Sequence, residues 1–148
     1  MNTRIKEDVK IKLSAIWVAH FLIWIFGDIL RFLHPGFMEE IIENPISNTN
    51  LMFIALLGIF QACMIVLSVV LDQKPNRLAN IIIGSIFLLI NIAYIVDLIF
   101  NKKPAWEYEL AIVYLIFNIL TIWYAYKWGP KESQSPSRIS SIDLVPPD

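Results

Sequence analysis

The sequence predicts an all-α fold, a four-helix transmembrane bundle with both termini in the cytoplasm. Three observations lead to this prediction. Four apolar stretches fill most of the 148-residue chain, and each is long enough for a helix to cross a hydrocarbon core of about 30 Å. Hydrophobic residues make up 57% of the chain, and its mean hydropathy is +0.60. Basic residues gather on one side of the spans. This composition is typical of a membrane protein rather than of a soluble domain.

The chain divides into three predicted parts. A basic segment over 1–13 is followed by the bundle over 14–128 and by a tail over 129–148. The tail is rich in Ser, Pro and charged residues and is expected to be disordered, because it has too little apolar surface to bury. The four spans are expected over 14–33, 51–71, 78–100 and 108–126.

The first span is read as a retained helix, since its apolar region is too long for a signal peptide and no small-residue cleavage site follows it. It ends at His34-Pro35-Gly36, where proline removes a donor and glycine permits a turn. The next residues, Phe37–Glu43, fit a short amphipathic helix at the outer interface, with Phe37, Ile41 and Ile42 expected to face lipid.

The second and third spans are expected to form an antiparallel hairpin, because only a short polar link over 72–77, around Pro75, joins them. Within the second span, Gly58 and Ala62 form a small-xxx-small pair that favours a close helix contact. The fourth span begins after Pro104. Its aromatic residues at the far end fit the interfacial belt: Trp123, Tyr124, Tyr126 and Trp128.

The charges of the connecting segments predict the orientation, because Lys and Arg concentrate on the cytoplasmic side. The N-terminal segment, the link over 72–77 and the tail are basic, whereas the link between the first two spans is acidic. Lys102 and Lys103 oppose this orientation but are outnumbered. The protein is therefore expected in the cell (cytoplasmic) membrane as a multi-pass protein, N-in and C-in.

Polar residues inside the spans predict a candidate site. At 100° per residue, His20, Asp28 and Arg31 share one face of the first helix. Such faces turn inward, because lipid cannot satisfy them. The set of seven also falls at two depths, and its members are His20, Asp28, Arg31, Gln61, Asn91, Glu107 and Asn118.

The central depth holds His20 and the three amides, and the outer depth holds the charges. Asp97 is also at the outer depth but lies about 100° from the polar line of its helix. Three acids against Arg31 give the outer vestibule a negative charge that favours a cation or an amine. Each residue also has a structural alternative. The amides can hold helices together, and Asp28 can neutralise Arg31 three residues away.

Other chemistry finds no support in the sequence. The single cysteine, Cys63, excludes an internal disulfide and a cysteine metal site. Metal-ligand clusters, phosphate loops and nucleophile elbows are missing from the sequence pattern, and no long basic run favours nucleic acid. No catalytic residue, cofactor or metal is predicted.

Three segments together resemble a family of small bacterial and archaeal four-helix membrane proteins classified as a domain of unknown function. They are 24–30 leading to Pro35-Gly36, 76–84 and 122–128, and the resemblance extends over about residues 12–128. It implies a four-span bundle in a prokaryotic cytoplasmic membrane. It transfers no catalytic residue, but it adds interest to Asp28, Arg77 and Asn80, which lie in the matching segments.

Three functions stay open at this point. A structural or accessory membrane subunit ranks first, with polar stripes that hold the bundle together. A bundle that binds or transports a small molecule or cation ranks second and would act as a homo-oligomer. A membrane enzyme acting on a lipid-like substrate ranks third. The expected partners are the lipid bilayer and either further copies of the chain or a larger membrane complex, with no nucleic acid.

Overall fold

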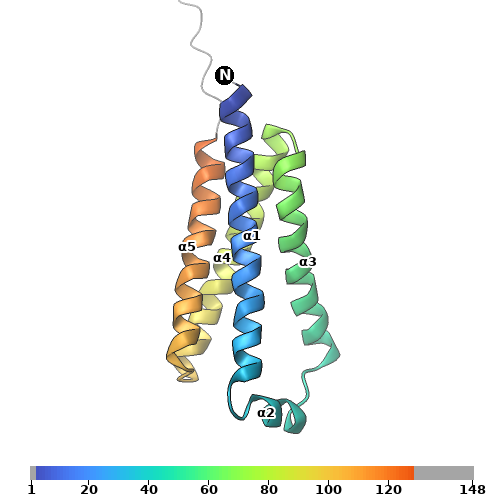
Figure 1. Cartoon of the computed structure of the whole chain (residues 1–148), viewed down its shortest axis with the longest axis vertical. Coiled ribbons are helices and arrows are strands. Elements are labelled where there is room, and N and C mark those ends of the chain that lie inside the picture. Colours follow the sequence, from blue (N-terminus) through green and yellow to red (C-terminus); the bar gives the residue numbers. More distant parts are fainter. Residues whose placement is uncertain (1–2, 129–148) are drawn as a thin grey trace, which may run out of the picture.

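The predicted all-α fold is confirmed in the computed structural model, which describes the backbone of residues 3–128 and side chains from Asp8 onwards (Figure 1). The predicted disordered tail over 129–148 lies outside the described residues. This part of the chain forms five helices and no strand: α1 (Thr3–Leu33), α2 (Phe37–Glu43), α3 (Asn48–Val70), α4 (Gln73–Phe100) and α5 (Ala105–Lys127). Four of them, all except α2, are long and apolar enough to span a membrane.

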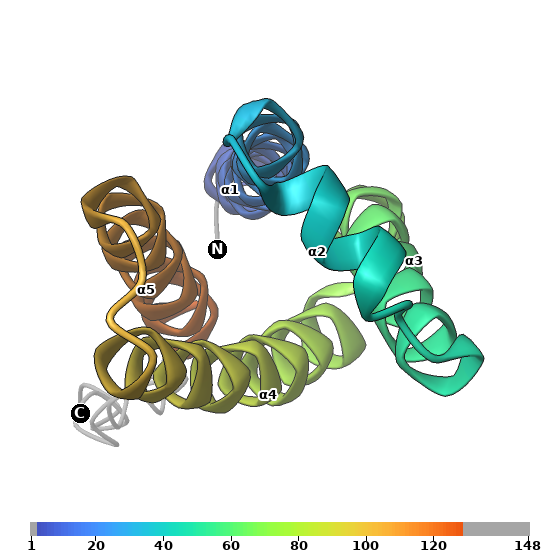
Figure 2. The same cartoon turned by 90° about the horizontal axis from the view of Figure 1, so that it is seen from below.

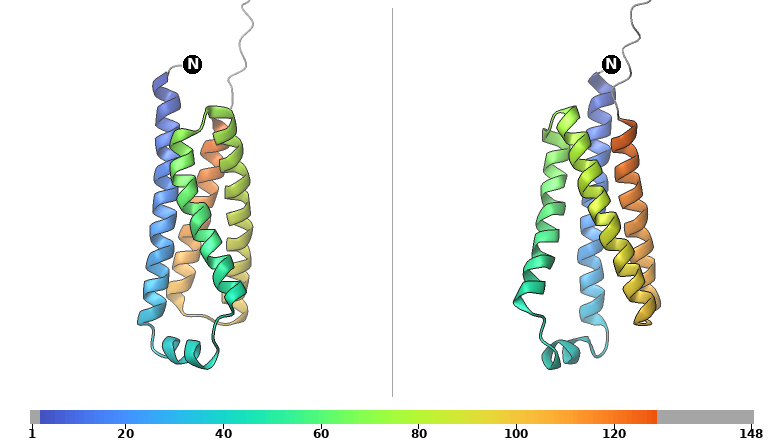
Figure 3. Two further views of the ribbon diagram at one scale, coloured as in Figure 1. Left: turned by 90° about the vertical axis from the view of Figure 1, so that its right-hand side faces the viewer. Right: turned by 180° about the vertical axis from the view of Figure 1, so that it is seen from behind.

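The long helices run up and down, and α2 crosses one end from α1 towards α3 (Figures 1 and 2). We call this the α2 end, which also holds the α4–α5 connection. The terminal end holds the start of α1, the α3–α4 connection and the end of α5. Helix α1 packs along both α3 and α5, and α4 packs along α5. Helices α3 and α4 are antiparallel, as expected, but they diverge from their connection towards α2 and share few contacts (Figures 2 and 3).

Helix α1 begins earlier than the predicted boundary at Ser14. Val9 and Leu13, one turn apart, pack against Trp128 at the end of α5, and Leu13 is completely buried. The predicted start of the helix is too late because basic residues lie between Val9 and Leu13. Charged residues indicate the edge of the membrane, but they do not end a helix. Here Lys10 instead lies across the α1–α3 contact and donates from Nζ to the carbonyl oxygen of Val69, at 3.2 Å.

The predicted loop over 72–77 is wrong, because α4 already begins at Gln73. Pro75 lies in the first turn of α4, where a missing N–H breaks no intrahelical hydrogen bond. The connection is therefore very tight, and Asn76 belongs to the helix and is buried.

A fully buried hydrogen-bond network follows from this earlier start of α4. Trp17 Nε1 donates to Asn80 Oδ1 at 2.7 Å, and Asn80 Nδ2 donates to Asn76 Oδ1 at 2.7 Å. Asn76 Nδ2 then donates to the carbonyl oxygen of Ser68 at 2.7 Å. Ser68 and both asparagines are 0% exposed. The network joins α1, α3 and α4 at the terminal end.

The close helix contact expected at Gly58 is confirmed. A Cβ atom added there would lie only 2.8 Å from Cζ3 of Trp24, so α3 could not approach α1 as closely with any larger residue. The other small residue of the pair, Ala62, is exposed instead. Helix α4 approaches α5 in a similar way at Gly84, where an added Cβ would lie 3.2 Å from Ile122 Cγ1.

We expect Asn80→Ala to lower the free energy of unfolding by about 1–3 kcal/mol, because it leaves the buried Trp17 Nε1 and Asn76 Oδ1 without their partner. Unfolding in mixed micelles with increasing dodecyl sulfate measures this change. The matched control is Asn101→Ala at an exposed position, which should change stability by less than about 0.5 kcal/mol. Equal losses of stability in Asn80→Ala and Asn101→Ala would contradict a stabilising role for the buried network.

Candidate functional site

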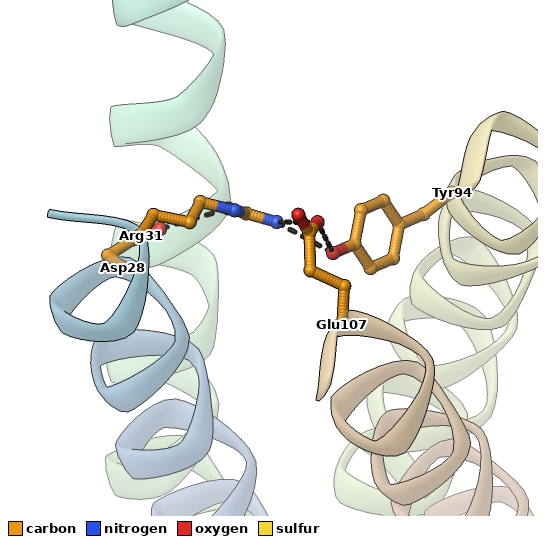
Figure 4. Close-up of polar contacts among 4 residues, drawn as sticks. All are labelled: Asp28, Arg31, Tyr94 and Glu107. Carbon is orange, nitrogen blue, oxygen red and sulfur yellow. Dashed lines mark hydrogen bonds and ion pairs between the residues drawn. The ribbon is translucent and has the colours of Figure 1, made fainter. Parts of the chain in front are cut away.

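A charged cluster joins three helices at the α2 end (Figure 4). Arg31 of α1 donates from Nη1 to Asp28 Oδ1 at 3.2 Å, and from Nη2 to Glu107 Oε2 of α5 at 3.3 Å. Tyr94 of α4 completes the cluster. Its hydroxyl accepts from Arg31 Nη2 at 2.7 Å and donates to Glu107 Oε2 at 2.8 Å. The structure thus brings together the three charged residues of the predicted site and adds a tyrosine.

Burial differs sharply within this cluster. The side chain of Glu107 is 9% exposed, that of Arg31 31% and that of Asp28 46%. A carboxylate buried as deeply as Glu107 is stable only with its cation beside it. Arg31 therefore holds α1 and α5 together, whereas its contact with the half-exposed Asp28 contributes little.

A cavity of about 490 Å³ lies at the α2 end, and Arg31, Tyr94 and Glu107 of this cluster line it. Helix α2 forms one wall, and its Phe37 and Ile41 line the cavity. Both residues, which are expected to face lipid, are half-buried in the fold, whereas Ile42 is 73% exposed. We call this the outer cavity. Two cations and three acids line it, a formal charge of −1: Arg31, Glu40, Asp97, Lys103 and Glu107.

Asp97, which does not fit the polar line of its helix, is exposed at the wall of the outer cavity. It accepts a hydrogen bond from Asn101 Nδ2 at 2.7 Å near the end of α4. Its side chain therefore belongs to the surface of the outer cavity and not to the Arg31 cluster.

A second cavity, of about 100 Å³, lies near the middle of the spans and takes residues from all four long helices. We call it the inner cavity. His20 of α1, Gln61 of α3, Asn91 of α4 and Asn118 of α5 line it, and their exposed fractions are 6%, 3%, 5% and 1%. The structure thus brings the four central residues of the predicted site around one space.

These four residues are poorly paired. Five of their buried atoms have no hydrogen-bond partner among the described residues: His20 Nδ1 and Nε2, Gln61 Oε1, Asn91 Oδ1 and Asn118 Nδ2. Asn91 Nδ2 does donate to the carbonyl oxygen of Ala111, at 3.1 Å. Each unpaired buried group costs about 1–3 kcal/mol, and native structures contain few of them. Holding helices together, as the Asn91 bond to Ala111 does, does not by itself account for the five unpaired atoms.

Aromatic rings surround His20. The ring centroid of Tyr114 lies 5.2 Å from that of the imidazole, that of Phe87 lies 5.7 Å away, and that of Trp17 lies 5.8 Å away. The inner cavity is therefore a small space with mostly apolar, aromatic walls, and the four polar residues also line it. Its volume equals about three water molecules at roughly 30 Å³ each, well below the roughly 300–1,000 Å³ of sites for drug-sized ligands. It fits a molecule of a few heavy atoms.

Tyr94 lines both cavities, so the Arg31 cluster stands between them. Sequence reasoning left Tyr94 out of the site, although its position next to the Asn80–Asn91 line of α4 was the signal that could have found it. The arrangement can admit a small molecule to the outer cavity, hold it at a hydroxyl and a carboxylate, and offer donors and acceptors further in.

Arg31→Met should lower the free energy of unfolding by about 3 kcal/mol, because it leaves Glu107 buried without a cation. Asp28→Asn should lower it by less than about 1 kcal/mol, because that carboxylate is half exposed. Combining Arg31→Met with Glu107→Gln should recover most of the loss. A double-mutant cycle in mixed micelles compares Arg31→Met, Glu107→Gln and the double variant, and Asp28→Asn is measured in the same way. Additive losses in the cycle would show that Arg31 and Glu107 do not interact.

Comparison with protein-family models, with curated proteins and with solved structures finds no match for this chain. The resemblance to the four-helix family of unknown function therefore stays a prediction.

Proposed function

We propose that this membrane protein binds a small hydrogen-bonding molecule inside the bilayer, at the inner cavity. One observation supports this function above the others. Five unpaired buried atoms belong to four residues on four helices, and all four residues line the same cavity. A ligand that pairs with these atoms would offset the cost of burying them.

The chemistry of the atoms favours a small primary amine. Gln61 Oε1 and Asn91 Oδ1 are acceptors for its N–H groups, and Asn118 Nδ2 is a donor for its lone pair. His20 can supply either role, because a neutral imidazole has one donor and one acceptor nitrogen. An ammonium form has no lone pair for Asn118 Nδ2, so the neutral amine is the form that pairs with all of these atoms at the inner cavity. The formal charge of −1 around the outer cavity favours the ammonium form over an anion on entry.

The proposed route passes from the outer cavity to the inner cavity at Tyr94. The Tyr94 hydroxyl is bonded to Arg31 and Glu107, so the ligand enters when this cluster opens. An amine can replace the tyrosine hydroxyl as a donor to Glu107 Oε2. Passage across the whole bundle is a separate property, which flux measurements distinguish from binding.

An accessory role is the second candidate, and the surface of α3 favours it. Only Gln61, Met64 and Ser68 of this helix are buried, and α3 shares few contacts with α4. A transmembrane helix of a larger complex, or of a second copy of the chain, can pack against that surface. An enzyme acting on a lipid-like substrate has the least support, since such a molecule greatly exceeds about 100 Å³.

Gln61→Met tests the binding function. It replaces a buried amide whose Oε1 is unpaired with an apolar side chain of similar shape, so we expect the free energy of unfolding to stay equal or rise. We also expect methylamine to raise the melting temperature of the wild-type protein in nanodiscs but not that of the variant. A fall in stability of more than about 1 kcal/mol in Gln61→Met would identify the amide as a structural contact instead.

The matched control is Gln73→Met. The Gln73 amide is paired, because its Nε2 donates to the carbonyl oxygen of Trp128 at 2.8 Å. This variant should lose stability and keep the full response to methylamine. Uptake of labelled methylamine by proteoliposomes then separates transport from binding: uptake by the wild type that is lost in Gln61→Met indicates passage, and binding without uptake indicates a receptor or sensor. An absent response of the wild type to millimolar methylamine would overturn the amine proposal.

We further propose that the termini face the cytoplasm in the cell membrane, as the charges predict. In a Cys63→Ser background, a cysteine replacing Glu40 at α2 should react with a membrane-impermeant maleimide on intact cells. A cysteine replacing Lys12 at the terminal end should react only after the cells are lysed. The reverse pattern would invert the orientation. Both positions are exposed, so accessibility within the fold does not bias the comparison.

A further inference from the structure

Hydrogen-bond donors gather around a third cavity, at the terminal end. It has a volume of about 320 Å³, and its polar lining comes from Gln73, Lys74, Arg77 and Trp128. Trp128 is only 4% exposed, and its indole Nε1 has no hydrogen-bond partner among the described residues. An N–H group buried in this way costs free energy unless an acceptor binds it. The Trp128 N–H at this cavity is therefore available to an acceptor on a ligand.

Neither cation at this cavity forms an ion pair with a described residue. Both ion pairs in the described part of the chain belong to Arg31, at the other end of the bundle. Arg77 donates from Nε to the carbonyl oxygen of Ala125 at 3.2 Å, which fixes the guanidinium beside the end of α5. Asp72, just before α4, is exposed and does not line the cavity. The formal charge of the lining is thus +2.

The other wall of the cavity is apolar. Leu78 and Ile81 lie further along α4 towards the middle of the span, and Leu78 is 60% exposed. Exposed aromatic residues flank this region on α5: Trp123 is 52% exposed and Tyr126 is 68% exposed. Such aromatic residues are typical of the headgroup level of a bilayer. The cavity therefore has cations at the level of the headgroups and apolar residues at the level of the acyl chains.

We propose that this cavity binds the phosphate group of an anionic phospholipid, such as phosphatidylglycerol. The guanidinium of Arg77 suits two phosphate oxygens at once, Lys74 adds a second charge, and the Trp128 N–H donates to the remaining oxygen. Basic pockets at the ends of transmembrane helices are suited to anionic headgroups. Inorganic phosphate would satisfy the same donors, but it would leave the Leu78 and Ile81 wall without a role. This site is independent of the amine site.

Native mass spectrometry and thermal unfolding of the full chain test the proposal with three probes: phosphatidylglycerol, phosphatidylcholine and inorganic phosphate. We expect the wild type to retain one phosphatidylglycerol and to bind it about thirty-fold more tightly than phosphatidylcholine, as roughly 1 kcal/mol for each of the two basic residues implies. The double variant Lys74→Gln and Arg77→Gln should lose this preference. Trp128→Phe should weaken it by a few-fold while keeping both charges.

The matched control removes two cations from the same end but outside the cavity, Lys12→Gln with Lys127→Gln. This variant should keep the bound phosphatidylglycerol. Equal losses of bound phosphatidylglycerol in the two double variants would mean that surface charge attracts the lipid without a defined site. Equal affinity of the wild type for phosphatidylglycerol and phosphatidylcholine would also overturn the proposal. Stabilisation of the wild type by inorganic phosphate alone, to the same extent as by phosphatidylglycerol, would reassign the cavity to free phosphate. Because Arg77→Gln also removes the bond to Ala125, Lys74→Gln alone must show part of the loss.

Discussion

Hydrocarbon offers no hydrogen-bond partner, and this constraint places the polar side chains of the bundle. At the terminal end, Trp17, Asn76 and Asn80 meet one another and the Ser68 carbonyl inside the protein. At the α2 end, Arg31 lies against Glu107, where one charge compensates the other. These two groups join helices from different parts of the chain. Between them, apolar side chains pack around Trp17, Met64 and Phe87.

The middle of the bundle departs from this rule. His20 Nδ1 and Nε2, Gln61 Oε1 and Asn118 Nδ2 have no hydrogen-bond partner among the described residues, and all three residues line the inner cavity. A protein keeps such a cost where the unpaired groups serve a ligand, because binding sites commonly trade stability for function. The gathering of unpaired atoms from four helices around one cavity therefore favours a ligand at the centre of the bundle.

The packing of α1 explains why there is room for these cavities. Helix α1 lies between α3 and α5, with Gly58 allowing α3 to approach Trp24. Helices α3 and α4 are held together only near their tight connection and diverge from it (Figure 3). At the α2 end, where α3 and α4 are apart, α2 forms a wall of the outer cavity. The short amphipathic helix thus completes a site as well as connecting two spans.

The sequence by itself determined the four apolar helices, the bounds of α2 and the face of each span that carries polar residues, because these follow from hydropathy and from the local helical period. It could not determine which polar residues pair. Asn80 and Asn91 lie on one line of α4, yet Asn80 meets Trp17 while Asn91 keeps an unpaired oxygen beside the inner cavity. The difference depends on the axial register and divergence of neighbouring helices, which only long-range packing decides. The same packing brought Tyr94 into the charged cluster, and it drew Asn76 into α4 where the charge pattern indicated a loop.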